Sequence, residues 1–185
     1  MEAFINPPER IPLYLKIGIW VTKKVTGREL LPAKILAWYP KAALGSGALE
    51  ALVAHRDGRL DERMLKIVRI QASYAAACPF CIDINSTNYQ ETHITPDEMM
   101  VLKGQKTIID VVTFTEREQL AIQYAKRITQ TPLQFPTAFV EELKRCFNER
   151  EIVVLASTAA QVNYWARLNQ ALGIPPAGFS NQADL

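Results

Sequence analysis

Polar and apolar residues recur with helical spacing through the middle of the chain. Between Asp61 and Ala77, apolar positions are interrupted at intervals of four, three and four by Glu62, Lys66, Arg69 and Ser73. This spacing predicts a helix with one polar, solvated stripe and an apolar face that packs against the rest of the protein. Asp61 is expected to cap its N-terminus, because a short carboxylate there accepts a free backbone N–H.

Three later segments begin with residues that favour a helix start. Thr95 and Thr115 each precede a glutamate by three residues, the capping-box spacing, and Asn148-Glu149-Arg150-Glu151 opens the third segment. The segment after Asn148 runs to Leu172 and is apolar on most sides, so we expect a central buried helix that ends before Gly173. Polar residues inside such a helix need partners, and they are Gln161, Asn163 and Arg167.

The first 60 residues predict shorter elements. We expect one helix over 13–26 and another over 32–44, which Pro40 breaks or kinks. Gly45-Ser46-Gly47 then predicts a joint before a further helical stretch over 48–55. No alternating pattern in the chain is long enough to build a sheet. The sequence therefore predicts an all-α fold of many helices, in a single domain over residues 1–185.

Composition and charge exclude several classes of function. Of the 185 residues, 49% are hydrophobic and 22% charged, with a net charge of +2, so neither nucleic acid nor a membrane is expected as a partner. The basic residues near the N-terminus favour a solvated helix face, and they are Lys16, Lys23, Lys24, Arg28 and Lys34. No apolar run suits a membrane span and no signal-peptide layout appears, so a cytoplasmic protein is expected.

The strongest chemical signal is a pair of cysteines, in Cys78-Pro79-Phe80-Cys81. Pro79 suits the first turn of a new helix, so the sulfurs are expected near free N–H groups that stabilise a thiolate. Four polar or thiol side chains would share one face of a helix over 80–92, and they are Cys81, Asn85, Asn88 and Thr92. A neighbouring thiol can then close a disulfide, which favours redox chemistry.

Inert packing and zinc binding compete with redox chemistry as roles for the two cysteines. Cysteines are often small buried hydrophobic residues, as we expect of Cys146. A zinc site would need more than two ligands, and His55, His93 and Cys146 show no ligand spacing, so no metal or other cofactor is expected. A glutaredoxin-like site would need strands around the motif, whereas an amphipathic helix precedes it here.

A helix followed by CxxC at the start of a second helix resembles the carboxymuconolactone decarboxylase and alkylhydroperoxidase-D-like family. The resemblance covers residues 60–176 and rests also on Arg63–Val68, Asn148–Val153 and Ala171–Pro175. It implies an alkylhydroperoxidase-D-like all-α fold with CxxC at a helix N-terminus, and a homo-oligomer. Residues 1–59 would then form an N-terminal helical extension that packs on this core.

The resemblance also implies roles for single residues. Cys81 would be the attacking thiol and Cys78 the resolving one. The family has histidine where this chain has Asn85, and glutamate where it has Lys66. Asparagine can orient a neighbour by hydrogen bonding but cannot take a thiol proton, so the proton relay is degenerate. Loss of the base that accepts this proton lowers the rate by roughly 10²–10⁴-fold. An arginine common in the family falls at Gln71.

These observations lead to a first hypothesis and two alternatives. The first is a thiol-dependent peroxidase or disulfide oxidoreductase, acting on a small peroxide and recycled by a dithiol reductant, with Cys81, Cys78 and Asn85 as its site. It requires sulfurs that can bond to each other and be reached from outside. The second is a non-redox decarboxylase-like enzyme for a small organic substrate. The third is a binding or scaffold protein that has lost catalysis.

Overall fold

The computed structural model describes residues 2–51, 57 and 60–180. Over these residues it is helical, with no named strand, which confirms the predicted all-α fold. The α-helices are α1 Leu13–Thr26, α2 Leu31–Ile35, α3 Pro40–Ala51, α4 Glu62–Ala75, α5 Pro79–Asn85, α6 Pro96–Leu102, α7 Glu116–Thr129, α8 Thr137–Cys146 and α9 Glu149–Ala171. Short 3₁₀ turns add η1 Leu36–Trp38, η2 Tyr89–Thr92 and η3 Ile108–Asp110.

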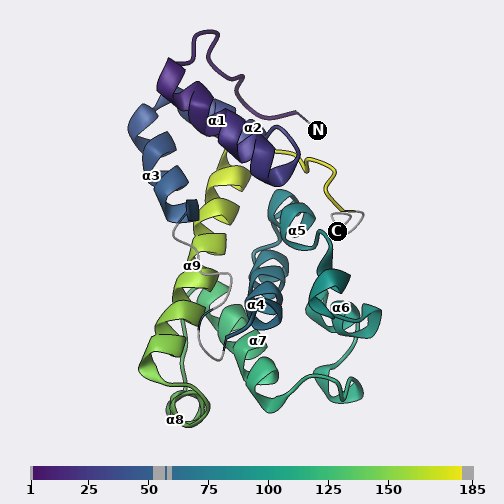
Figure 1. The fold of residues 1–185 in the computed structure, drawn as a ribbon. Coiled ribbons are helices and arrows are strands. Elements are labelled where there is room, and N and C mark those ends of the chain that lie inside the picture. The colour runs from purple at the N-terminus through teal and green to yellow at the C-terminus, as the bar shows by residue number, and fades with distance from the viewer. Residues whose placement is uncertain (1, 52–56, 58–59, 181–185) are drawn as a thin grey trace.

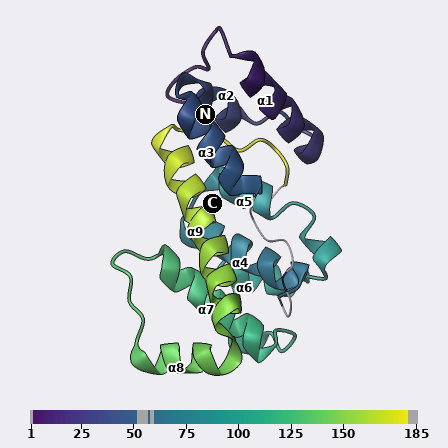
Figure 2. The ribbon, with the colours of Figure 1, turned by 60° about the vertical axis from the view of Figure 1, so that its left-hand side comes forward.

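The centre of the molecule is formed by α4, α7 and α9, which pack against one another (Figure 1). The apolar face of α4 contributes Leu65 and Val68 to a core that includes Leu155 and Ala159 of α9. Asp61 caps α4 as predicted, because its carboxylate accepts the Met64 N–H over 2.8 Å. Figure 2 shows α8 at the end of the molecule where α9 begins. The same packing holds α5 against α4 and α9.

Both predicted capping boxes form, and a third forms at Asn148. At each one, the side chain of the capping residue accepts the backbone N–H of the glutamate three residues later. The carboxylate of that glutamate in turn accepts the backbone N–H of the capping residue. α9 spans the predicted range, but the expectation that most of it is buried was wrong, because Val153 is 62% exposed and Tyr164 40%. The reason is that the buried apolar positions of α9, such as Leu155, Ala159 and Val162, form one stripe that joins the core shared with α4 and α7.

Two ion-paired clusters join these elements at the start of α4 and α7. The Arg63 guanidinium lies 2.6 Å from a carboxylate oxygen of Glu98 and 2.6 Å from one of Glu118. Arg117 lies 2.9 Å from Glu151. All three glutamates are buried capping-box residues, so each carboxylate serves its helix N-terminus and a guanidinium together.

The N-terminal helices lie at the far end of α9 from α8 (Figure 1). α1 matches the predicted helix, and Pro40 breaks the next segment as predicted, since it begins α3. The predicted joint at 45–47 was wrong, because α3 continues through it to Ala51. Two interior glycines disfavour a helix by about 1 kcal/mol each, but Ser46 is buried and bonds the Tyr164 hydroxyl over 2.6 Å. Tertiary packing therefore decides this element.

Among the described residues, no helix is both long enough and apolar enough to cross a bilayer.

Candidate active site

The two thiols follow directly on the C-terminus of α4. The Ala77 N–H donates to the Tyr74 carbonyl and the Cys78 N–H to the Ser73 carbonyl, which is a Schellman ending. Ala77 has φ +47°, a left-handed conformation that favours glycine. The Gln170 amide of α9 donates to the carbonyls of Ala76 and Ala77, so this turn is held from two sides.

Cys78 and Cys81 are joined by a disulfide, with Cα atoms 5.2 Å apart. Cys78 is the N-cap of α5, Pro79 occupies the first turn, and the Cys81 N–H donates to the Cys78 sulfur over 3.2 Å. This agrees with the predicted helix start beside the thiols. The same N–H would stabilise a Cys78 thiolate after reduction.

Both sulfur-bearing residues are covered in this state. Cys78 is 0% exposed and Cys81 2%, so the first requirement of the redox interpretation is met and the second is not. The cover is apolar and comes from the chain's two ends, and its members include Leu30, Leu31, Ile35, Ala166, Leu172 and Ile174. A reagent can reach the sulfurs only if part of this cover moves.

The part of the cover that follows α9 is a strap, residues 172–180, fixed mainly by Asp83. This buried α5 carboxylate accepts the Ala177 N–H over 2.8 Å and the Ser180 N–H over 2.6 Å. Arg28 adds a bond to the Ala177 carbonyl over 2.9 Å, and the Phe4 N–H donates to Leu172. Both carboxylate oxygens of Asp83 therefore hold the strap.

Asn169 of α9 is a site residue that sequence analysis did not single out. It is 1% exposed, and its Nδ2 lies 3.9 Å from the Cys81 sulfur, a weak N–H···S contact. Its Oδ1 is buried and has no partner among the described residues. Its spacing of eight from Gln161 on one helix could have revealed it, because the two share a face. Each sulfur thus has one N–H donor, from Cys81 for Cys78 and from Asn169 for Cys81.

Asn85 lies one turn beyond Cys81, and its amide donates to the Ser73 hydroxyl over 2.9 Å. This bond ties α5 to α4, and it directs the amide to Ser73 rather than to a sulfur. Ser73 is 0% exposed, so the predicted solvation of this stripe was wrong at that residue. The helix over 80–92 was also wrong, because α5 ends at Asn85 and Asn88 has φ +52°.

Lys66 was expected to be solvated, and the structure corrects this. Its Nζ donates to the Thr87 carbonyl over 2.7 Å. Burial lowers the pKa of Lys66, and the neighbouring Arg69 charge lowers it further. Gln71 is buried in α4. Burial also raises the pKa of Tyr74, so this phenol stays protonated at neutral pH and is no base for a thiol.

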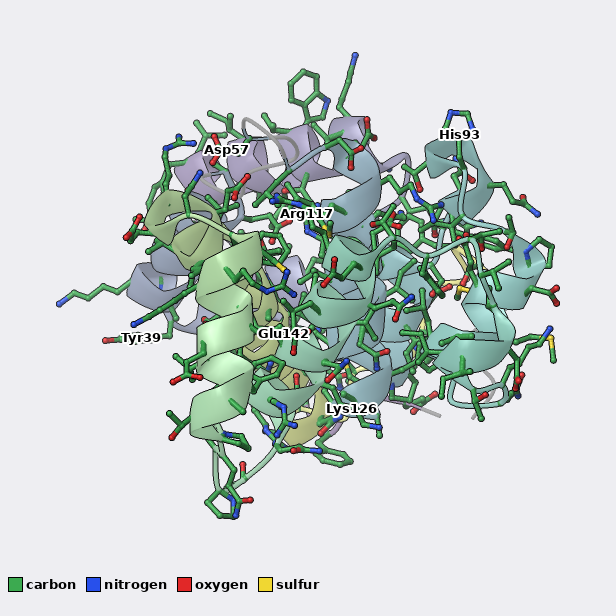
Figure 3. All side chains as sticks on the ribbon, turned by 90° about the horizontal axis from the view of Figure 1, so that it is seen from below. Tyr39, Asp57, His93, Arg117, Lys126 and Glu142 are labelled. Atoms are coloured by element: carbon green, nitrogen blue, oxygen red, sulfur yellow. A yellow bond between two sulfur atoms is a disulfide. The ribbon has the colours of Figure 1, made fainter. Side chains whose placement is uncertain are left out.

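The third cysteine and the described histidine lie apart from this site. Cys146 is a free thiol packed at the edge of the α4–α7–α9 core, as expected. Figure 3 shows His93 at the outer edge of the molecule. His55 lies outside the described residues. Within the described part of the chain, no three His, Cys, Asp or Glu residues converge as metal ligands do.

Comparison with known proteins bears on the fold. Uncharacterized protein YnjA of Escherichia coli K12 is 24% identical over 94% of both chains, and no family model matches. An uncharacterized peroxidase-related protein from Silicibacter sp. TM1040 superposes with a TM-score of 0.80 at 16% identity, over 98% of this chain and 96% of that one. The alkylhydroperoxidase AhpD core protein from Ralstonia eutropha JMP134 gives 0.78 at 16%, over 99% and 97%.

The chain has the alkylhydroperoxidase-D-like fold. The fold prediction is therefore confirmed, and the family resemblance drawn from the sequence is supported. The debrominase Bmp8 shares this fold, with a TM-score of 0.78 at 19% identity over 100% of this chain and 98% of that one. One alkylhydroperoxidase-D-like scaffold thus occurs in proteins named for different reactions.

Proposed function

We propose that this protein is a thiol-dependent peroxidase or disulfide oxidoreductase that uses Cys78 and Cys81. The observation that carries the proposal is the disulfide across the start of α5, with a separate N–H donor at each sulfur. Two thiols placed this way can cycle between a dithiol and a disulfide without a cofactor. The alkylhydroperoxidase-D-like fold of the peroxidase-related neighbours is consistent with this chemistry.

Reduction of a peroxide ROOH by these thiols balances in three steps. The Cys81 thiolate attacks the terminal peroxide oxygen, the O–O bond breaks, and RO⁻ leaves and takes a proton to become an alcohol. Cys81 is then a sulfenic acid. The Cys78 thiol attacks that sulfur, the disulfide forms and water leaves. A small or protein dithiol returns two electrons and two protons, and its own thiols become a disulfide.

The amides near the sulfurs contribute to this cycle in different ways. The Asn169 N–H is placed to stabilise charge on Cys81, while Asn85 positions α5 through Ser73. Neither amide is a base at neutral pH, so the Cys81 proton must leave to solvent or to the reductant. Turnover therefore needs both a movement of the cover and a slow deprotonation.

The test is dithiol-dependent peroxide consumption by variants of each cysteine. Cys81→Ser is expected to abolish consumption, and Cys78→Ser to allow a single turnover that ends in a sulfenic acid. Cys146→Ser is the matched control, since this third thiol packs at the edge of the core, and it should keep the wild-type rate. Equal turnover in Cys81→Ser and wild type would remove the proposal.

A second candidate function is a non-catalytic scaffold. The observation that favours it is the burial of both cysteines under the apolar cover. The scaffold function predicts that iodoacetamide alkylates the two reduced thiols no faster than the whole protein unfolds. Alkylation that is faster than unfolding, measured by mass spectrometry against hydrogen exchange of the core, would instead support the redox function.

A further inference from the structure

The side-chain amide of Asn169 faces the disulfide from α9. Asn169 is 1% exposed, and its Nδ2 lies 3.9 Å from the Cys81 sulfur. Its Oδ1 is buried and accepts no hydrogen bond from any residue that the structure describes. The two ends of this amide therefore differ, because one donates weakly to a sulfur and the other has no donor.

The end of α9 fixes this amide beside the sulfur. The Asn169 carbonyl accepts the Ile174 N–H over 2.9 Å, which ties the helix end to the strap. The next side chain, Gln170, donates to the two backbone carbonyls that directly precede the cysteine motif. Bonds from the strap and from the turn before the motif therefore hold Asn169 against the disulfide.

The disulfide form leaves the Asn169 acceptor without a donor. The disulfide shares an apolar cluster with Ala166 of α9 and Ile174 of the strap, whose side chains carry no polar atom. A buried acceptor without a partner is costly, because it has lost its hydrogen bonds to water. A disulfide sulfur carries no hydrogen, so the oxidised pair cannot relieve this cost.

Reduction of the pair provides the donor. The thiolate of a dithiol such as dithiothreitol attacks one sulfur, the S–S bond breaks, and a second exchange releases the reductant as its own disulfide. The two electrons and two protons that it delivers leave thiols on Cys78 and Cys81. Rotation of the Asn169 amide by half a turn exchanges its ends, so that Oδ1 accepts the Cys81 S–H. Without that rotation, the N–H stabilises a Cys81 thiolate.

We propose that Asn169 shifts the equilibrium of the Cys78–Cys81 pair toward the dithiol, because its amide offers an acceptor to the Cys81 thiol and a donor to the thiolate. This inference rests on the proposed redox role of the pair and adds a residue that sets its reduction potential. The disulfide is thereby reduced more readily, which suits a pair that a dithiol must regenerate in every cycle.

Redox equilibration of the full chain tests this role. The protein is incubated in mixtures of reduced and oxidised dithiothreitol, quenched in acid and analysed by mass spectrometry. The equilibrium constant does not depend on how the reductant passes the cover. Asn169→Leu, which has nearly the same shape and no polar group, should lower the equilibrium constant for reduction roughly tenfold, a potential about 30 mV more negative.

Two further variants control this measurement. Asn163→Leu makes the same change on α9 at an amide that donates to Thr129 instead of a sulfur, and it should keep the wild-type potential. If Asn169→Leu fails to fold, Asn169→Ser is measured instead. Its side chain is too short to reach the sulfur, so its potential should move in the same direction. An equal shift in Asn163→Leu would contradict a specific role of Asn169.

Stability gives an independent readout of the same shift. In the unfolded chain Asn169 does not contact Cys81, so a change in potential must reappear as a difference between the two folded forms. The folding equilibrium constant of Asn169→Leu should therefore fall roughly tenfold more in the reduced form than in the disulfide form. Equal losses in the two forms, or equal potentials in wild type and Asn169→Leu, would overturn the proposal.

Peroxide consumption separates this inference from the proposed function. If wild type consumes no peroxide but Asn169→Leu shifts the potential, the peroxidase proposal fails and the role of Asn169 stands. If wild type consumes peroxide and has the same potential as Asn169→Leu, the role of Asn169 fails alone. A wild-type protein that unfolds when the pair is reduced also contradicts the inference, because the folded dithiol would then lack the support assigned to Asn169.

Discussion

The first turn of α4 and its later turns hold the same kind of charge in different ways. Arg63 lies between two buried carboxylates, each 2.6 Å from its guanidinium. Further along the helix, Lys66 donates to a backbone carbonyl, and burial lowers the pKa of Arg69 although the negative charge of Glu50 opposes this effect. The beginning of the helix thus places a guanidinium between two buried carboxylates, whereas in the later turns burial lowers the pKa of Lys66 and of Arg69.

This difference distinguishes the ion-paired first turn of α4 from the region of the candidate site. Buried charges that are completely paired fix one arrangement of helices and leave little for a ligand to bind. Incompletely satisfied features remain at the other end, including the buried Asn169 Oδ1 and the left-handed Ala77. Such features persist where the surrounding fold over-determines them, and they concentrate at functional sites.

The largest expected effect is the loss of the paired region. Arg63→Ala should lower the free energy of unfolding by about 3–5 kcal/mol, because it leaves the carboxylates of Glu98 and Glu118 buried without their cation. Chemical denaturation followed by circular dichroism measures this. Arg150→Ala, which removes an exposed guanidinium from its pair with Asp57, is the control and should change stability far less, because exposed ion pairs are screened by solvent. Equal losses in the two variants would contradict the comparison.

Acid should weaken the paired end. Burial of Glu98 opposes its ionisation, but bonds from Arg63, the Thr95 backbone and Thr113 outweigh burial and lower its pKa. Its contribution to stability is therefore present above the ordinary glutamate pKa and is lost as pH falls through the lowered value. Measured at a series of acidic pH values, the free energy of unfolding should change less steeply with pH in Glu98→Gln than in wild type. An unchanged slope would show that other carboxylates dominate.

Alkaline pH should raise the free energy of unfolding through Lys66. Because burial lowers the pKa of Lys66, the unfolded chain binds more protons there, and stability should rise as pH increases between the two pKa values. Chemical denaturation at a series of alkaline pH values checks this, and Lys66→Met should remove the rise. A rise that persists in Lys66→Met would assign it to another group.

Releasing the strap should have a smaller effect on stability and a clear effect on thiol access. Asp83→Asn turns two charge-assisted bonds to Ala177 and Ser180 into one neutral bond, a loss of about 1.5–3 kcal/mol. The loss should appear mainly as faster hydrogen exchange at those two amides and faster alkylation of the reduced thiols. Asp97→Asn, at an exposed site on α6, should change neither rate.

The smallest effect concerns the turn before Cys78. Ala77→Gly should raise stability by about 0.5–1 kcal/mol, since glycine accepts the left-handed conformation without a Cβ penalty. Ala75→Gly, in the exposed last turn of α4, is the contrasting variant and should destabilise by a similar amount. A loss of stability in both variants would show that the strain at Ala77 is negligible.

Local patterns predicted the helices well. Capping residues such as Asp61 and Thr115 act through neighbouring backbone groups, so sequence spacing alone reveals them. The prediction failed where a distant contact decides the element. Gly45 and Gly47 indicated a joint, but the bond between Ser46 and Tyr164 joins residues 118 positions apart and keeps α3 helical.

The thiol pair was predictable from its motif, and its surroundings were not. Cys78 as an N-cap follows from Pro79 and helix geometry. The contact of Asn169 with Cys81 and the bond of Gln161 to Glu50 span 88 and 111 residues. No periodicity within one helix specifies which partner a polar side chain finds on another. The burial of Ser73 has the same cause, since its hydroxyl accepts the Asn85 amide of another helix.

The strap also has a consequence for the order of events during synthesis. The strap residues that bind Asp83 are made 94 and 97 residues later, so the cysteine pair leaves the ribosome long before the strap exists. At roughly 5–20 residues per second, several seconds pass in which the nascent thiols can meet small oxidants or reductants. The redox state that the finished protein encloses is therefore open to being set on the ribosome.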